Sequence, residues 1–193
     1  MPSFLDALGP IIDAFESLAI PYYIGGSVAS IAHGVPRTTL DVDIVAVIRP
    51  NQARTLVEQL ADAYFLQIED IQDAIVNRTS FNALHIATMI KVDVFLAPNR
   101  PFDRSKAQRA RPGRVTEYDT REFNLTSPED IVLQKLEWYN MGGKISERQW
   151  SDVQGVIRVQ HTALDVGYLR RWATELHLLD LLDRALQQAM HLP

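Results

Sequence analysis

The most informative segment of the chain reads Asp41-Val42-Asp43-Ile44-Val45-Ala46-Val47-Ile48. Its β-branched residues favour a strand, in which residues i and i+2 point to the same face, so both carboxylates would lie side by side. Aspartate is depleted in strands, and local violations of this kind tend to fall at functional sites. The segment therefore predicts a strand that presents two carboxylates, and a solvated strand end is the plainer interpretation.

A third aspartate lies in a second apolar run, Ile90-Lys91-Val92-Asp93-Val94-Phe95-Leu96. If this run is a neighbouring strand, Asp93 joins Asp41 and Asp43. Three clustered carboxylates repel one another and need a cation to stay ionised together. Oxygen-only ligands suit Mg²⁺, which also carries substrate phosphates, and such sites serve phosphoryl or nucleotidyl transfer. Because Lys91 shares the predicted face of Asp93, a salt bridge between the two is the alternative.

A Gly25-Gly26-Ser27 turn precedes the aspartates, between a predicted strand over 20–24 and a predicted helix over 27–33. Glycines let the backbone approach a ligand closely, and a serine hydroxyl with free N–H groups can hold phosphate oxygens. A tight turn capped by Ser27 is the plainer interpretation. Arg37 either orients the carboxylates or a triphosphate, or is a surface-loop arginine.

The overall composition bounds the class of protein. The chain has 193 residues, of which 47% are hydrophobic and 22% charged, as in an ordinary globular domain. It has no cysteine, so disulfides and thiolate metal sites are excluded and a reducing cytoplasm is the default expectation. The N-terminus shows no signal-peptide pattern, and no apolar run approaches the length of about 18 residues that a membrane helix needs. The net charge of −5 argues against a protein that coats nucleic acid.

The pattern along the chain predicts an α+β fold, with a mixed-sheet half over 1–125 and a helical half over 126–193. In the first half we expect a helix over 4–19 with Pro10 in the first turn of its main part, a helix over 51–64, and antiparallel strands over 81–88 and 90–96. Thr126-Ser127-Pro128 begins the helical half, whose helices are expected over 128–141, 147–160, 165–176 and 178–190. Lys135 lies in the middle of the first of these, where it either reaches phosphates or is an ordinary exposed lysine.

Residues 98–114 look like a loop, because prolines and a glycine interrupt them. This segment carries much basic charge, from Arg100, Arg104, Lys106, Arg109, Arg111 and Arg114, offset only by Asp103. In an acidic protein this asymmetry suggests a loop that faces an anion such as the backbone of RNA or DNA, and a solvated surface loop is the alternative. The scattered histidines form no zinc-binding pair.

Taken together, three segments resemble the nucleotidyltransferase superfamily with the DNA polymerase β-like core. They are Ile24-Gly25-Gly26-Ser27, then Arg37-Thr38-Thr39-Leu40-Asp41-Val42-Asp43-Ile44, then Val92-Asp93-Val94. The Ser-Pro-Glu-Asp-x4-Lys helix start is most similar to that of bacterial abortive-infection toxin-type nucleotidyltransferases, in which the helix lysine and an acid on the next helix belong to the pattern. Lys135 and Asp152 occupy comparable places here.

The resemblance implies a metal-dependent enzyme that moves a nucleoside monophosphate from a nucleoside triphosphate to an acceptor, with release of pyrophosphate. Asp41, Asp43 and Asp93 would be catalytic and hold Mg²⁺ or Mn²⁺. Gly25, Gly26, Ser27, Arg37 and Lys135 would bind the nucleotide. The acceptor stays open among RNA, protein and small molecules, as does the oligomeric state. A weakly active or inactive binding partner in a toxin–antitoxin-like pair is the competing function.

Overall fold

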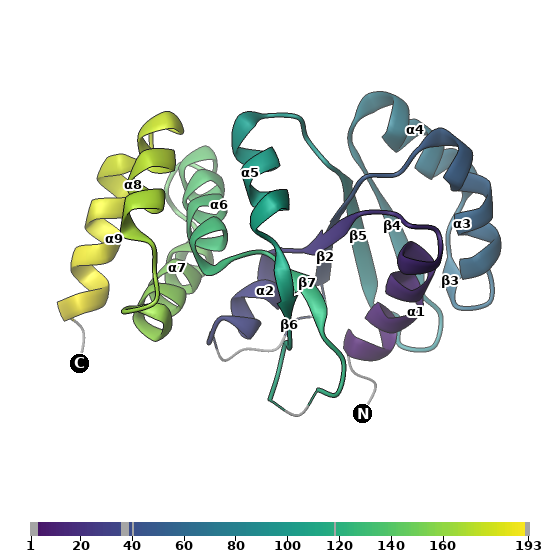
Figure 1. The fold of residues 1–193 in the computed structure, drawn as a ribbon, viewed down its shortest axis with the longest axis horizontal. Helices are drawn as coiled ribbons and strands as arrows, with labels where there is room; N and C mark the ends of the chain where they lie inside the picture. The colour runs from purple at the N-terminus through teal and green to yellow at the C-terminus, as the bar shows by residue number, and fades with distance from the viewer. Residues whose placement is uncertain (1–3, 36–38, 40, 118, 192–193) are drawn as a thin grey trace. The chain divides into compact units, whose positions relative to one another are not determined.

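A computed structural model describes residues 4–35, 39, 41–117 and 119–191 (Figure 1). The chain divides into two units, one made of residues 1–28 and 38–108 and the other of residues 29–37 and 109–193. Among the described residues, no helix is long and apolar enough to cross a membrane. The predicted α+β class is confirmed.

The first unit alternates helices and strands around a mixed sheet. Its described strands are ordered β3-β4-β5-β2-β1, with β2 parallel to β5 and the other neighbours antiparallel. The antiparallel pairing expected for the strands over 81–88 and 90–96 is confirmed. The elements in chain order are α1 (Phe4–Ser17), β1 (Tyr22–Ile24), α2 (Gly26–Ala32, which continues into the second unit), β2 (Asp41–Ala46), the short 3-10 helix η1 (Pro50–Gln52), α3 (Ala53–Leu60), β3 (Tyr64–Phe65), α4 (Ile68–Asn77), β4 (Ser80–His85), β5 (Lys91–Leu96) and α5 (Pro101–Arg109).

The two faces of this sheet differ sharply in polarity. Along β2 and β5, Val42, Ile44, Val92 and Val94 are fully buried, and α1, α3 and α4 pack on that side. Because side chains alternate between faces along a strand, the aspartates that separate these residues must point to the opposite face. Burial of the apolar set therefore fixes where the carboxylates stand.

The second unit holds an antiparallel strand pair and a group of helices. Strand β6 (Arg111–Gly113) pairs with β7 (Phe123–Leu125). The helices are α6 (Pro128–Met141), α7 (Glu147–Gln160), α8 (Val166–Glu175) and α9 (Leu179–His191). The hydroxyl of Ser127 accepts a hydrogen bond from the backbone N–H of Asp130, which confirms the predicted cap of α6.

Two sequence predictions of local structure are wrong. Residues 98–114 are not a loop, since they form α5 and β6. Helix α5 has almost no apolar periodicity to reveal it, and a buried cluster of charges around Asp103 stabilises it instead. Helix α1 also runs without interruption from Phe4 to Ser17, so Pro10 lies inside the helix rather than in a first turn.

Candidate active site

The register between β2 and β5 places the predicted catalytic aspartates together. Asp43 and Asp93 are paired residues on these neighbouring parallel strands, which lie about 4.8 Å apart in any sheet. Asp41 is two residues from Asp43 and faces the same side. The structure therefore brings the three carboxylate-bearing positions to one patch on the open face of the sheet, at the amino-terminal half of β2.

Lys91 is the immediate partner of this patch. Its Nζ lies 2.9 Å from Oδ2 of Asp93, and it pairs in register with Asp41. The hydrogen bond from the ammonium to Asp93 raises the pKa of Lys91, and the negative charges of Asp93, Asp41 and Asp43 add to this increase. The salt bridge that the sequence allowed is thus present, and the ammonium lies within the field of all three carboxylates.

The glycine turn lies directly against Asp43. The backbone N–H of Gly25 donates to the carbonyl of Asp43 at 2.9 Å. Gly26 has a φ of +55°, and a Cβ atom at this position would stand 1.8 Å from Oδ2 of Asp43. Only glycine fits both the backbone conformation and the close approach. Ser27 follows as a buried residue in the first turn of α2, so the predicted turn and carboxylate patch are neighbours.

Asn82 is a further polar residue of this patch, which was not predicted from the sequence. Asn82 on β4 pairs in register with Asp93, so that Asn82, Asp93 and Asp43 form a row across three strands. The alternation of exposed and buried residues along β4 could have revealed the exposed face of Asn82, but only the register of the hairpin places it beside Asp93. The next position along the same face of β5 is Phe95, whose side chain is 37% exposed.

Lys135 and Asp152 form a buried ion pair in the second unit. Nζ of Lys135 lies 2.7 Å from Oδ2 of Asp152, and both side chains are less than 5% exposed. Lys135 also donates to Oε1 of Gln149 at 3.3 Å. The interpretation of Lys135 as an ordinary exposed lysine is therefore wrong. Its ion pair with Asp152 links α6 to α7. Nucleotide binding by Lys135 stays a prediction.

The basic segment over 98–114 uses much of its charge internally. Asp103, which is 3% exposed, pairs with Arg100 at 2.7 Å and with Lys106 at 3.1 Å. Burial alone would raise the pKa of Asp103, but hydrogen bonds and charges from these two cations outweigh burial and lower it. Arg100, just before α5, and Lys106, on α5, therefore both pair with the carboxylate of Asp103.

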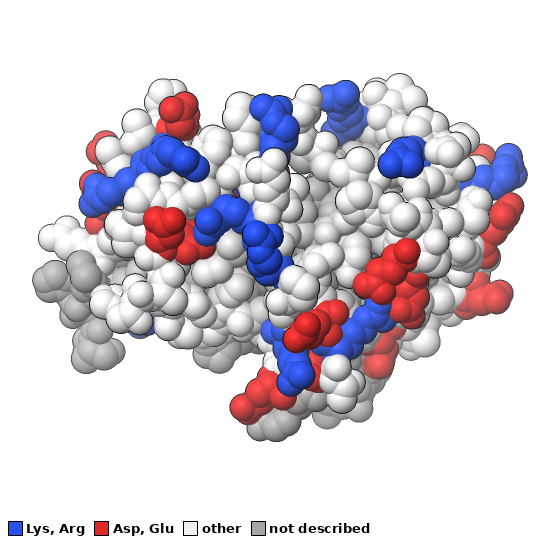
Figure 2. Space-filling model, in the orientation of Figure 1, with Lys and Arg blue, Asp and Glu red and all other residues white. Residues whose placement is uncertain are grey.

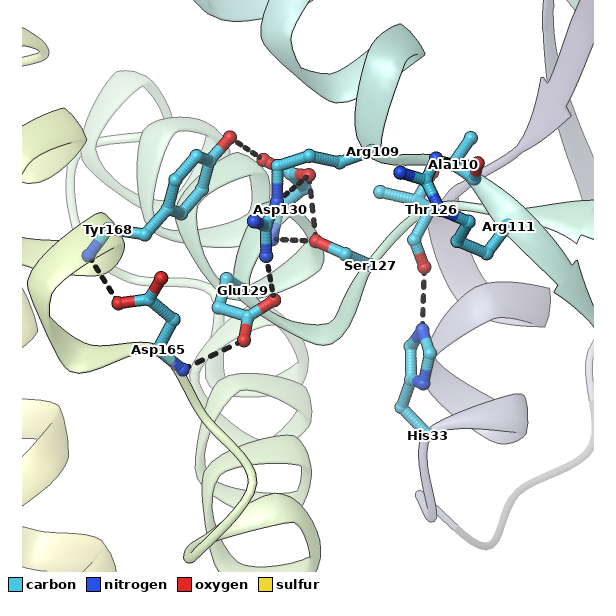
Figure 3. Close-up of polar contacts among 10 residues, drawn as sticks. All are labelled: His33, Arg109, Ala110, Arg111, Thr126, Ser127, Glu129, Asp130, Asp165 and Tyr168. Carbon is cyan, nitrogen blue, oxygen red and sulfur yellow. Dashed lines mark hydrogen bonds and ion pairs between the residues drawn. The ribbon is translucent and has the colours of Figure 1, made fainter.

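Arg109 belongs to a separate network in the second unit, which Figure 3 shows. Its guanidinium lies 2.7 Å from Oε2 of Glu129, 3.6 Å from Oδ2 of Asp130 and 4.0 Å from the ring centroid of Tyr168. The hydroxyls of Ser127 and Tyr168 donate to the two oxygens of Asp130 at 2.7 and 2.6 Å. This network fastens the start of α6 to α8, so Arg109 has a structural role in the described chain.

His33, just after α2, also lies in the second unit. Its Nε2 is 2.6 Å from the carbonyl oxygen of Thr126, and this contact appears beside the network in Figure 3. Burial lowers the pKa of His33, although the hydrogen bond to Thr126 and the charge of Glu129 oppose this shift. The imidazole therefore serves here as a half-buried hydrogen-bond donor to the carbonyl oxygen of Thr126.

Two predictions about the site are not tested by the described geometry. Arg37 lies outside the described residues. Among the residues that the structure does describe, no group of three or more histidine, aspartate or glutamate side chains is arranged to hold a metal ion. The patch offers carboxylate oxygens on adjacent strands, and such ligands suit Mg²⁺ or Mn²⁺. A metal ion bound by Asp93 would take the place of the Lys91 ammonium in the present ion pair.

The fold is similar to that of several solved structures. An antigenic nucleotidyltransferase-like protein from Paracoccidioides brasiliensis has 19% identity and a TM-score of 0.56, over 95% of this chain and 92% of that one. ANT(2")-Ia in complex with adenylyl-2"-tobramycin has 14% identity and a TM-score of 0.55, over 90% and 96%. The lincosamide antibiotic adenylyltransferase LnuA, bound to lincomycin, has 16% identity and a TM-score of 0.51, over 79% and 95%.

No protein-family model matches the sequence, and no curated protein matches it either. The structural likeness covers nearly the whole of this chain and of the chains that it resembles. The chain therefore shares its fold with these solved nucleotidyltransferase structures.

Proposed function

We propose that this protein is a metal-dependent nucleotidyltransferase, which moves a nucleoside monophosphate from a nucleoside triphosphate to an acceptor. The observation that carries the proposal is the register of β2 and β5, which sets Asp43 beside Asp93 and Asp41 on the same face. A glycine turn lies against this patch, with Gly26 in contact range of Asp43. Carboxylates beside a close backbone turn suit the binding of a triphosphate together with a divalent cation.

Each residue of the patch has a proposed role. Asp41, Asp43 and Asp93 would hold Mg²⁺ or Mn²⁺, which when bound neutralises phosphate charge and makes the acceptor hydroxyl more acidic. The turn at Gly25 and Gly26, with the adjacent Ser27, would hold the triphosphate tail. Arg37 and Lys135 keep their predicted role in nucleotide binding, as part of the same proposal.

The proposed reaction is a single displacement at the α-phosphorus. The acceptor oxygen forms a bond to this phosphorus while the bond to the bridging oxygen breaks, so pyrophosphate leaves with the electron pair. Asp93 accepts the proton of the acceptor hydroxyl. Before it can do so, its carboxylate must separate from Lys91, which lies 2.9 Å away. The protein otherwise contributes position and charge rather than covalent chemistry.

A small hydroxyl-bearing molecule is the acceptor that the structure favours over RNA. The basic segment, which suggested an RNA backbone, has Lys106 and Arg109 in internal ion pairs. The fold neighbours include proteins solved with adenylyl-2"-tobramycin and with lincomycin, which are small molecules. The toxin-type likeness and a protein acceptor stay predictions. The labelling assay below tests whether the acceptor is a protein.

An α-labelled nucleoside triphosphate identifies the acceptor. The protein is incubated with each of the four labelled triphosphates and Mg²⁺, in the presence of cell extract separated into small-molecule, protein and RNA fractions. Label should pass to one fraction, with an equal amount of pyrophosphate released, and Asp43→Asn should abolish both. The matched control is Asp62→Asn, which makes the same chemical change at an exposed aspartate between α3 and β3. Label transfer that survives Asp43→Asn would contradict the proposal.

A further inference from the structure

The first unit contains a cavity that the proposed reaction does not use. Its volume is about 430 Å³, and it lies where β2 and β5 end, beside the end of α4 and the first turns of α5. Ala46, Leu96 and Ile75 give it an apolar floor. Crevices outside the carboxyl ends of parallel strands are common ligand sites, and β2 and β5 are parallel neighbours.

This cavity lies away from the carboxylate patch. Asp41 begins β2, and Ala46 ends it. At about 3.3 Å per residue along the strand, Ala46 lies roughly 16 Å from Asp41 and roughly 10 Å from Asp43. Asp41 and Asp43 lie in the first half of the strand, so their carboxylates would not contact a small ligand bound in the cavity. The inference therefore stands independently of the proposed function.

Two arginines from different elements line the cavity. Arg78 is the residue that ends α4, and Arg104 lies on α5. Arg104 is held in place by Asn99, since it donates to the backbone carbonyl of Asn99 at 2.7 Å and to its side-chain oxygen at 3.1 Å. Within the described part of the chain, neither arginine makes an ion pair. On the face in Figure 2, basic side chains stand over α5 and near the end of α4, with uncharged surface between them.

The acid that also lines the cavity does not cancel this charge. Asp103 is 3% exposed and already pairs with Arg100 and Lys106. Counted together, Asp103 and its two partners still carry one excess positive charge. Arg78 and Arg104 thus add to a cationic wall in a protein whose net charge is −5.

We propose that this cavity binds a small organic anion, with an oxyanion group between Arg78 and Arg104 and an apolar body over Ile75 and Leu96. A guanidinium matches the geometry of a carboxylate or phosphate with paired hydrogen bonds. The volume falls within the range of about 300–1,000 Å³ for small-molecule sites, and such sites combine apolar walls with a few polar groups. A carboxylate and a phosphate monoester share this chemistry, so both are used as probes.

The backbone at Arg78 makes a clean test variant available. Arg78 has a φ of +52°, the left-handed conformation in which glycine is normally found at a helix end. Arg78→Gly should therefore remove the cation while leaving the fold at least as stable as before. On the opposite wall, Arg104→Gln removes the second cation. Ala107→Phe fills the cavity from the exposed side of α5 and leaves both arginines intact.

The experiment follows backbone amide shifts by NMR as phenyl phosphate or benzoate is added to the 193-residue protein in EDTA. Shifts should centre on Ala97, Asn99 and Ala107, and inorganic phosphate should bind more weakly because it lacks the apolar body. Each arginine variant should weaken probe binding by roughly tenfold. Ala107→Phe should abolish it. A matched control, Arg54→Gln on α3, removes one exposed positive charge outside the cavity and should leave the affinity unchanged.

Each outcome bears on the proposal. Tighter binding of phenyl phosphate than of benzoate assigns a phosphate ester to the site, and the reverse order assigns a carboxylate. Shifts at these amides that persist unchanged in all three cavity variants would overturn the proposal. So would the absence of any shift there with millimolar concentrations of both probes.

Discussion

Replacing Lys91 by methionine tests whether the carboxylate patch is held together by this ammonium before any metal arrives. The ion pair joins Nζ of Lys91 to Asp93 at 2.9 Å, with side chains that are 47% and 16% exposed. Exposed pairs contribute about 0.2–1 kcal/mol, and the partial burial of Asp93 favours the upper end of this range. We therefore expect Lys91→Met to lower the free energy of unfolding by about 1 kcal/mol in EDTA at pH 7. In a chain of this size, that equals a fall in Tm of about 2–4 °C.

The assay is urea unfolding followed by circular dichroism, with a double-mutant cycle to Asp93→Asn. Since the pKa of Lys91 is raised above its ordinary value of 10.5, its contribution is complete below that pH and is lost as the pH rises through the folded-state pKa. At neutral pH the contribution should therefore be constant. It should shrink in 1 M salt, because the pair is partly exposed to screening. Arg54→Met, which removes one exposed charge from α3, is the control.

Two results would refute this reasoning. One is a coupling energy between Lys91→Met and Asp93→Asn that is indistinguishable from zero at low salt. The other is an equal loss in the free energy of unfolding for Arg54→Met and Lys91→Met. Equal losses would mean that the change in net charge, rather than the ion pair with Asp93, causes the effect. Saturating Mn²⁺ should narrow the difference between wild type and Lys91→Met, because the metal supplies the positive charge that the variant lacks.

Three further predictions follow from buried or close contacts. Gly26→Ala should lower the free energy of unfolding by about 1–3 kcal/mol in urea titrations, because its Cβ would meet Asp43 at 1.8 Å; an unchanged midpoint would show that the turn adapts freely. Lys135→Met should lower the free energy of unfolding by about 3–5 kcal/mol, because it removes the cation that lies 2.7 Å from the buried carboxylate of Asp152, and Lys135→Met with Asp152→Leu should recover most of this loss; a double variant as unstable as the single would exclude this cause. Because burial lowers the pKa of His33 below 6.5, stability should be complete above pH 6.5 and fall as the pH drops, and unfolding scans of His33→Gln should show a shallower fall.

The sequence predicted those elements whose signals are local. Ser127 and Pro128 predicted the start of α6. The spans predicted for α6 and α7, 128–141 and 147–160, agree with the structure. Alternation of apolar residues with Asp41 and Asp43 predicted β2. The aspartate positions came together as expected because one buried face of the sheet fixes the register of both strands.

Features that depend on contacts between distant residues escaped prediction. Helix α5 is rich in charge, and its stability depends on the burial of Asp103 between Arg100 and Lys106, which no periodicity in the sequence reveals. The burial of Lys135 likewise requires Asp152 on the next helix. Asn82 could be placed beside Asp93 only once the register of β4 and β5 was known.

We propose that Asp41, Asp43 and Asp93 form one site that binds a divalent cation and a nucleoside triphosphate together. Calorimetry with Mn²⁺ and a non-hydrolysable α,β-methylene triphosphate measures this without knowledge of the acceptor. The wild type and Asp62→Asn should bind the triphosphate at least tenfold more tightly with Mn²⁺ than in EDTA, and Asp43→Asn should lose this gain. Equal affinity for the triphosphate with Mn²⁺ and in EDTA, or a gain that persists in Asp43→Asn, would contradict it.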